Sequence, residues 1–249
     1  MSALVRSELL KVRTVRSWWA YLIVIMLLTG IGAAGEIGSS ENENRSTLDF
    51  QLGLVDTVGL SVLFAIILGI TIVTNEFRHG TVTPTFLVEP RRERVLLSKA
   101  IAAVVVAIGF ALLSLVVLAA VAITWLTIVD AQLHVGDAEF LTRTGEQFLS
   151  VVLWALLGVA IGTAVHSQIA ALVGTLIWIF LVENLLVGLL GLVDADAVDE
   201  YLPFHALDAA DGSGGDNLLS YGPGVAVSLG WIALLGAFGI WRTTRRDIS

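Results

Sequence analysis

The 249-residue sequence contains no cysteine, which excludes disulfide bonds, thiolate metal sites and a cysteine nucleophile. It also has few charges, because only 14% of its residues are charged, against about 25% in a typical soluble domain. Hydrophobic residues make up 56%, and the mean hydropathy is +0.87. A soluble domain of this length needs a polar surface that this composition cannot supply, so the sequence excludes a soluble protein.

The signature motifs of hydrolases and nucleotide-binding proteins are missing too. The two lysines, Lys11 and Lys99, follow no glycine-rich stretch, so there is no phosphate-binding loop. The four histidines are scattered without an HExxH pair, and no GxSxG occurs. We therefore expect no catalytic site, no metal and no cofactor in this chain. Nothing in the sequence predicts a nucleic-acid partner.

What the sequence has instead is a set of six long apolar runs. A helix needs about 20 apolar residues, at a rise of about 1.5 Å each, to cross a bilayer. The runs cover residues 18–34, 52–74, 100–129, 148–165, 169–193 and 224–241. They predict an all-α integral membrane protein, with residues 1–249 forming one domain of six transmembrane helices. Trp18 and Tyr21 begin the first run and Trp241 ends the last, where aromatic interfacial anchors are expected.

The basic residues indicate the orientation of these helices. Twelve of the fourteen fall on one side of a six-span arrangement, in the N-terminal segment, the loop after the second run and the C-terminal tail. They are Arg6, Lys11, Arg13, Arg16, Arg78, Arg91, Arg92, Arg94, Lys99, Arg242, Arg245 and Arg246. The excess of arginine over lysine, with abundant Ala, Val and Gly, suggests a bacterial source. The positive-inside rule then predicts a multi-pass protein of the bacterial plasma (inner) membrane with both termini in the cytoplasm.

The acidic residues show the opposite bias. The segment between the fifth and sixth runs contains no Lys or Arg, and we expect it to lie outside the cell. Its acidic residues are Asp194, Asp196, Asp199, Glu200, Asp208, Asp211 and Asp216.

Residues 1–17 lead into the first run as a basic and weakly amphipathic segment. Four apolar side chains share one side of a helical wheel, and Glu8 interrupts the pattern. The four are Leu4, Val5, Leu9 and Val12. We predict an amphipathic helix in the cytoplasmic membrane interface, with a plain basic anchor as the alternative. A signal peptide cleaved after the first run is a further alternative, but this lead is long for one.

The loop between the second and third runs, from Glu76 to Lys99, is the most informative stretch. Gly80 is suited to end the second span in a left-handed cap, and Pro84 and Pro90 are expected to break the chain. Between the prolines, residues 85–88 predict one short apolar turn. These features predict a compact, folded connection between two membrane helices. A solvated basic turn is the alternative.

This loop resembles the cytoplasmic loop of the permease subunits of type 2 ABC exporters. The residues that carry the resemblance read E-F-R-H-G-T-V-T-P-T-F-L-V-E-P-R-R-E-R-V-L-L-S-K. Two further stretches are similar to the same family, and the three occur in the expected order. They are Ser7-Glu8-Leu9-Leu10-Lys11 with the tryptophan-rich start of the first run, and residues 201–207 after a fifth run that contains Glu183.

The resemblance implies a permease that pairs with a second copy or a related permease, and that carries two ABC ATPase subunits on its cytoplasmic face. It implies a coupling helix after the second span, and short re-entrant helices between the fifth and sixth spans. ATP and Mg would be bound by the ATPase and not by this chain. The ATPase-coupling residues would be Glu76, Arg78, His79, Gly80, Thr81, Pro84, Thr85, Phe86, Pro90, Arg91 and Arg92.

Two carboxylates, Asp56 and Glu183, lie inside apolar runs, where charge is costly and often functional. Counted from the span ends, both fall in the outer half of the membrane. They line an outer gate or cargo path in one interpretation, together with Asn184, and sit in the outer headgroup region in the other. If the fifth run bends back after Asn184, Glu183 lies at the turn of a re-entrant segment.

Gly158 and Gly162 form a GxxxG pattern in the fourth run, which lets helix backbones approach closely. We predict that this pattern serves packing within the chain, with a dimer seam as the alternative.

These features together favour the membrane subunit of an ATP-driven exporter with a hydrophobic or amphipathic cargo. The alternative is a proton-coupled secondary transporter that uses Asp56 or Glu183 as its proton site, although no inverted repeat supports it. A membrane-embedded enzyme is a third class, disfavoured by the lack of clustered catalytic residues.

Overall fold

The computed structural model describes residues 1–14, 17–192, 196–214 and 218–245, and the described residues are helical with short connections. Four of the residues used above for charge, Arg16, Asp194, Asp216 and Arg246, and the last residue of the run 169–193 lie outside these ranges. Among the described residues, six helical segments are long and apolar enough to cross a membrane, which makes the chain a multi-pass membrane protein. The prediction of six membrane helices is confirmed at this level.

The six segments contain four of the predicted runs whole and the other two, 100–129 and 169–193, up to Ile128 and Gly191, and they extend beyond most of the remaining run ends. In chain order, they are α2 (Ser17–Ser39), α3 with η2 and α4 (Leu48–Asp56, Thr57–Ser61, Val62–Arg78), α6 (Arg92–Ile128), α7 (Ala138–Val165), α8 with η3 and α9 (Gln168–Ile177, Trp178–Val182, Glu183–Gly191) and α11 (Tyr221–Arg245). The remaining elements are α1 (Ser2–Thr14), η1 (Asn44–Ser46), α5 (Val82–Val88), η4 (Asp196–Tyr201) and α10 (Pro203–Ala209). The helices are longer than the runs because backbone hydrogen bonding continues into polar residues, which an apolar window excludes.

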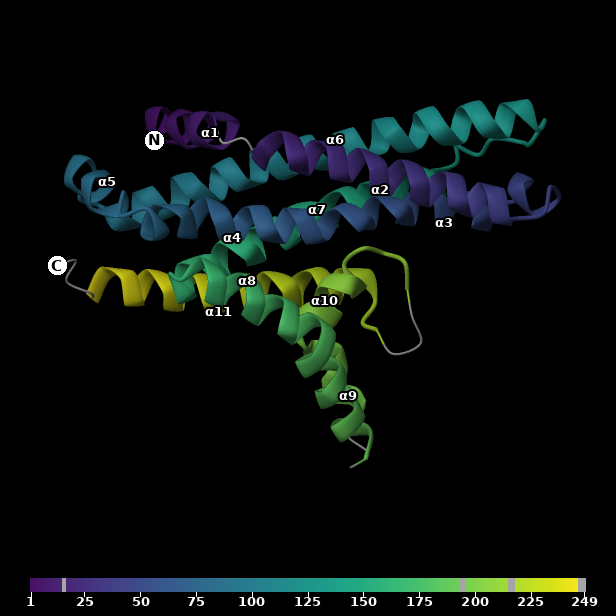
Figure 1. The fold of residues 1–249 in the computed structure, drawn as a ribbon. Helices are drawn as coiled ribbons and strands as arrows, with labels where there is room; N and C mark the ends of the chain where they lie inside the picture. The colour runs from purple at the N-terminus through teal and green to yellow at the C-terminus, as the bar shows by residue number, and fades with distance from the viewer. Residues whose placement is uncertain (15–16, 193–195, 215–217, 246–249) are drawn as a thin grey trace.

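The N-terminus and the C-terminal end of α11 lie at the same end of the helix bundle (Figure 1). This end, called the terminal end below, carries α1, α5 and the last turns of α11. The opposite end, called the distal end, carries the start of α3 and the end of α6. With 37 residues, α6 is about 55 Å long at about 1.5 Å per residue. It is longer than the hydrocarbon core of about 30 Å, as expected for the third run.

The closest packing in the bundle is between α4 and α7, where glycines let the two backbones touch. A Cβ atom added to Gly69 would lie 2.1 Å from the carbonyl oxygen of Ala155, and one added to Gly158 would lie 2.2 Å from that of Ile66. Gly162 faces Ile70 in the same way, at 3.0 Å. The GxxxG pattern therefore packs within the chain, as predicted.

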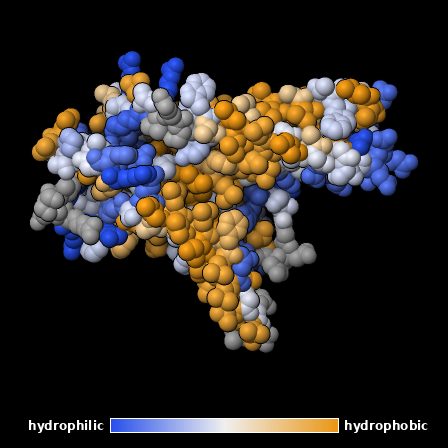
Figure 2. Space-filling model, in the orientation of Figure 1, coloured by the Kyte–Doolittle hydropathy of each residue, from blue (hydrophilic) through white to orange (hydrophobic). Residues whose placement is uncertain are grey.

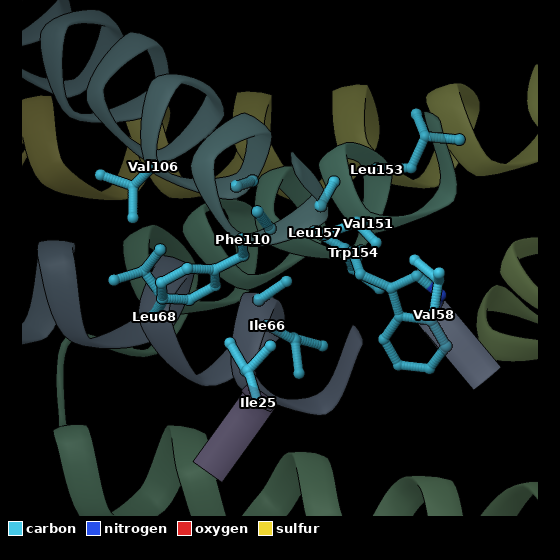
Figure 3. Close-up of a cluster of buried hydrophobic side chains, with 14 of the residues drawn as sticks. Ile25, Val58, Ile66, Leu68, Val106, Phe110, Val151, Leu153, Trp154 and Leu157 are labelled. Carbon is cyan, nitrogen blue, oxygen red and sulfur yellow. The ribbon is translucent and has the colours of Figure 1, made fainter. Parts of the chain in front are cut away.

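The core fills the space around this contact with side chains from α2, α4, α6 and α7 (Figure 3). Phe110 of α6 is fully buried and stacks on Trp18 of α2, with ring centroids 5.5 Å apart. Trp154 of α7 is buried and lies 5.4 Å from the ring of Phe204 in α10. This second contact ties the segment between the last two spans to the bundle.

The segment α8–η3–α9 diverges from the bundle toward its tip (Figure 1). The π-helical turn Trp178–Val182 lies in its middle, and large apolar side chains along the segment are exposed, including Ile169, Phe180 and Leu189. Figure 2 shows this segment, called the arm α8–α9 below, as a hydrophobic surface. The helix continues past Glu183 to Gly191, so the chain does not turn back at Glu183. Of the two arrangements left open by the sequence, the bend after Asn184 is therefore excluded; the irregularity is a π-turn, which a helix absorbs without reversing.

Candidate functional site

A cluster of two glutamates and two lysines lies at the terminal end. Lys99 of α6 contacts Glu8 of α1 at 2.8 Å and Glu76 of α4 at 3.1 Å. Lys11 of α1 contacts Glu8 at 2.6 Å and also bonds to Glu76. These are the only two lysines in the sequence, and both belong to this cluster. Three helices that are far apart in the chain are therefore joined by opposite charges.

The cluster is mostly shielded from solvent. The side chains of Glu8, Glu76 and Lys99 are 5%, 6% and 3% exposed, whereas that of Lys11 is 47% exposed. Burial opposes the charge on Lys11, but its hydrogen bonds to Glu76 and Glu8 outweigh this and raise the pKa of Lys11 above its usual value. Lys99 also donates to the carbonyl oxygen of Ile72 at 3.3 Å. Removing one member of such a buried set leaves the others as uncompensated charges, which is strongly destabilising.

The end of α4 places Glu76 in this cluster and then turns the chain sharply. Gly80 has a φ of +67°, in the left-handed region. The amide of Thr81 donates to the carbonyl of Glu76 at 2.9 Å, and that of Gly80 donates to Phe77 at 3.5 Å. These two bonds form a Schellman motif, so the predicted glycine cap is confirmed.

The helix α5 follows this cap and is longer than the predicted turn of residues 85–88. It begins at Val82, and Pro84 lies inside its first turn. The expectation that Pro84 breaks the chain was wrong, because a first-turn residue needs no backbone N–H and its fixed φ suits a helix. Pro90 does lie in the break between α5 and α6.

The base of α5 is attached to the bundle, whereas its tip is bare. The hydroxyl of Thr85 donates to Glu76 at 3.4 Å, and the guanidinium of Arg92 lies 5.3 Å from the centre of the Phe86 ring. Leu87 and Val88 are 78% and 84% exposed. An apolar tip on a short helix, fixed to buried charges, is an unusual feature for a solvated loop.

Arg92 also connects this region to the last helix. Its Nη1 donates to the carbonyl of Thr243 in α11. The Thr243 hydroxyl lies 2.8 Å from Nε2 of His166, the residue that ends α7 with a φ of +62°. The start of α6 and the ends of α7 and α11 are thereby held together beside α5.

The other coupling residues of the sequence prediction are at the surface of this region. Arg78 and His79 are exposed, and Arg78 donates to the amide oxygen of Gln168 at 3.0 Å. The backbone N–H of Arg91 bonds to Glu89 at 3.2 Å just before α6 begins. The structure thus brings together the predicted residues around Glu76, but adds Glu8, Lys11 and Lys99, which sequence reasoning did not select.

Asp56 and Glu183 have separate sets of partners. Asp56 ends α3 and faces α7, where Arg143 lies 3.3 Å away and Gln147 donates at 3.1 Å. Glu183 is 1% exposed, and its Oε1 accepts from the backbone amides of Phe204 and His205, both at 3.0 Å. Nδ1 of His205 lies 3.0 Å from the same oxygen.

The carboxylate of Glu183 therefore sits at the N-terminus of α10. Two unpaired amides at a helix start and the dipole of the helix favour a negative charge there. Asn184 is exposed and donates to the carbonyls of Ile179 and Phe180 at 3.1 and 3.4 Å, which supports the π-helical turn. The two neighbours thus serve different contacts and do not form one group.

Metal-type ligands do not gather in the described part of the chain. Within residues 1–14, 17–192, 196–214 and 218–245, no group of three or more His, Asp or Glu side chains is placed to hold a metal ion.

Comparison with known proteins gives a family but no function. A family model described as "Protein of unknown function (DUF2705)" matches residues 20–249, and the chain belongs to this family. The matched range includes Glu76 and Lys99 but not α1, which carries Glu8 and Lys11. A search of curated proteins found no match.

Proposed function

We propose that this member of the DUF2705 family is the membrane-spanning permease subunit of an ATP-driven exporter, coupled to a separate ATPase subunit. The observation that carries the proposal is α5, whose base is attached to the buried Glu76 and whose tip exposes Leu87 and Val88. In this proposal the terminal end faces the cytoplasm, as the basic residues predict.

The tip of α5 is suited to a soluble partner. Two large apolar side chains beside the basic residues Arg91 and Arg92 form a small anchor of the kind that fills a pocket on a partner protein. An ATPase subunit with a matching groove would cover Leu87 and Val88, and two such subunits would serve a pair of permeases. ATP and Mg would be bound by these partners.

Movement of α5 would reach the membrane helices through the ion cluster. Thr85 and Glu76 connect α5 to α4, and the two lysines continue this connection to α1 and α6. Closure of the ATPase subunits would push α5, and the cluster would pass the displacement to three helices at once. Buried ion pairs suit this role because they have strict geometry and a high cost of separation.

The remaining helices are assigned roles in the same proposal. In it, α1 lies in the cytoplasmic interface, and η4 with α10 form the short re-entrant pieces on the outer side. The exposed apolar arm α8–α9 would pack against lipid and against a second permease copy or a related permease. The cargo would be hydrophobic or amphipathic.

The test is co-purification of an ATPase subunit in mild detergent, using Val88→Glu and a matched control. We expect Val88→Glu to reduce the bound ATPase by about tenfold or more, because it places a charge in an apolar contact. Val135→Glu makes the same change at an exposed valine in the loop between α6 and α7, and should not alter ATPase binding.

Two outcomes would contradict the proposal. One is a purified protein that never carries an ATPase subunit, combined with export that survives substitution of Glu76 or Arg78. The other is transport that an uncoupler abolishes and ATP depletion does not affect, which would favour the proton-coupled alternative.

A further inference from the structure

A cavity of about 590 Å³ lies beside the ion cluster at the terminal end. Residues from α1, α2, α4, α6 and α8 and from the α5 region line it. Its volume is within the range of about 300–1,000 Å³ found for small-molecule sites. Neither the family description nor the proposed coupling role assigns an occupant to this cavity.

The rim of the cavity is polar and basic. Five of the described lining residues are exposed, and these are Lys11, Thr14, Arg78, His79 and Thr81. None of these five is acidic, and two carry a permanent positive charge. A ligand that approaches this rim therefore meets cations and hydroxyl groups first.

The acidic lining residues do not cancel this charge. Glu8 and Glu76 are buried and are already matched by the two lysines of the cluster. Arg78 donates to a neutral amide, that of Gln168, and belongs to none of the ion pairs among the described residues. The three cationic and two acidic side chains of the lining therefore leave one net positive charge, that of Arg78, to attract a ligand.

The inner wall of the cavity is apolar and aromatic. Trp18 and Tyr21 line one side, and Leu68 and Ile72 line another. Trp18 is held by its stacking on the buried Phe110, and Tyr21 packs 6.3 Å from the ring of Phe64. Tryptophan and tyrosine at the start of a membrane helix lie at the level of lipid headgroups. A cationic rim above an apolar wall at this level fits an amphiphile.

We infer that this cavity binds an anionic amphiphile. A phosphate or carboxylate would lie at Lys11 and Arg78, and an apolar portion would pack on Trp18, Tyr21 and Leu68. Arginine is suited to this task because its planar guanidinium donates two parallel hydrogen bonds to such a group. This binding step does not depend on the proposed function.

The experiment measures labelling of the purified full-length chain by a photoreactive phosphatidylglycerol in neutral detergent, without ATP or an ATPase. We expect labelled peptides within residues 8–21 and 68–81. Dihexanoyl-phosphatidylglycerol should compete for labelling, and dihexanoyl-phosphatidylcholine should not. Decyl phosphate is a second competitor, and it tests whether the site recognises the phosphatidylglycerol headgroup or any anionic amphiphile. Competition by both compounds would show that a negative charge and an apolar tail are sufficient for binding.

Substitutions at Arg78 give the decisive comparison. Arg78→Gln should weaken competition by dihexanoyl-phosphatidylglycerol about tenfold, the effect of one charge-assisted hydrogen bond. Arg78→Lys should retain most of the binding, and Arg94→Gln, at an exposed arginine outside the cavity lining, should retain all of it.

Three results would overturn the inference. They are equal competition by phosphatidylcholine, equal loss with Arg94→Gln, and competition by inorganic phosphate alone at the same concentration as the amphiphile. Because the measurement needs no partner, a negative result leaves the proposed function standing. Failure of ATPase co-purification would equally leave this binding result intact.

Discussion

Glu76 and Glu183 are both buried carboxylates, yet the chain surrounds them differently. Glu76 faces the side chains of two lysines that come from other helices. Glu183 faces two backbone amides and a histidine of one short helix. The first arrangement joins α1, α4 and α6, and the second fixes the start of α10 to Glu183 of the arm α8–α9. The comparison suggests that full charges serve where helices must act together, and amides serve where one segment must be held.

The largest effect should come from Lys99, the buried lysine of the cluster. Lys99→Met leaves Glu8 and Glu76 buried with only the half-exposed Lys11, and should cost about 3–5 kcal/mol of stability. Lys11→Met should cost about 1 kcal/mol or less, because water already screens that side chain. Unfolding midpoints in detergent measure both, and equal costs would show that burial does not set the strength of this cluster.

A smaller effect is expected at Glu183, whose partners are backbone amides and not lysine side chains. Glu183→Gln keeps an oxygen that can accept from Phe204 and His205 but loses the charge, so it should cost about 1–2 kcal/mol. Glu41→Gln, at an exposed loop residue, is the control and should leave stability unchanged. The same unfolding measurement applies. A cost as large as that of Lys99→Met would remove the distinction between the two sites.

The smallest effect concerns an ion pair that is not buried. In the loop between α6 and α7, Nδ1 of His134 lies 2.7 Å from Asp137, and Nε2 lies 3.1 Å from the carbonyl oxygen of Ser46. The hydrogen bonds to Asp137 and Ser46 raise the pKa of His134 above 6.5. A raised pKa means that this contact stabilises the loop fully below pH 6.5 and less as pH rises through the pKa of the folded protein.

Amide exchange of residues 131–137, corrected for its intrinsic pH dependence, tests this. Protection should decrease from pH 6 to pH 8, and Asp137→Asn should make the change smaller. Protection that instead increases over this range would contradict the assignment.

The membrane helices and the cap at Gly80 could be predicted from the sequence, because both depend on local patterns. Apolar runs long enough to span a bilayer are visible in one window, and glycine adopts a φ of +67° at no steric cost. The ends of the helices were less predictable. Pro84 shows why, since the same residue breaks a helix interior and suits a first turn.

The ion cluster could not be predicted, because its members are separated by up to 91 residues. Glu8 was treated as a defect in an amphipathic pattern, although it is the buried residue of α1. Lys99 was used for orientation and as the end of the loop that carries the family resemblance, but it was not selected as a site residue. One signal was present in the sequence. Twelve of the fourteen basic residues are arginine, and the two lysines, Lys11 and Lys99, both contact Glu76 in the structure.

Glu183 illustrates the same limit at the other site. Its position within an apolar run could be read from the sequence, but its partners begin about twenty residues later, at the start of α10. No local sequence pattern connects a carboxylate with the backbone amides of a helix that begins much later in the chain. The folded chain alone brings them together.

The uninterrupted length of α6 has a mechanical consequence. A helix of 37 residues with neither proline nor a π-turn acts as a stiff lever, because every peptide group in its middle is hydrogen-bonded to the next turn. A small tilt imposed at Lys99 would therefore be carried to Ile128 undiminished. The segment α8–α9 has a joint at Trp178–Val182 instead, so it can bend while α6 pivots.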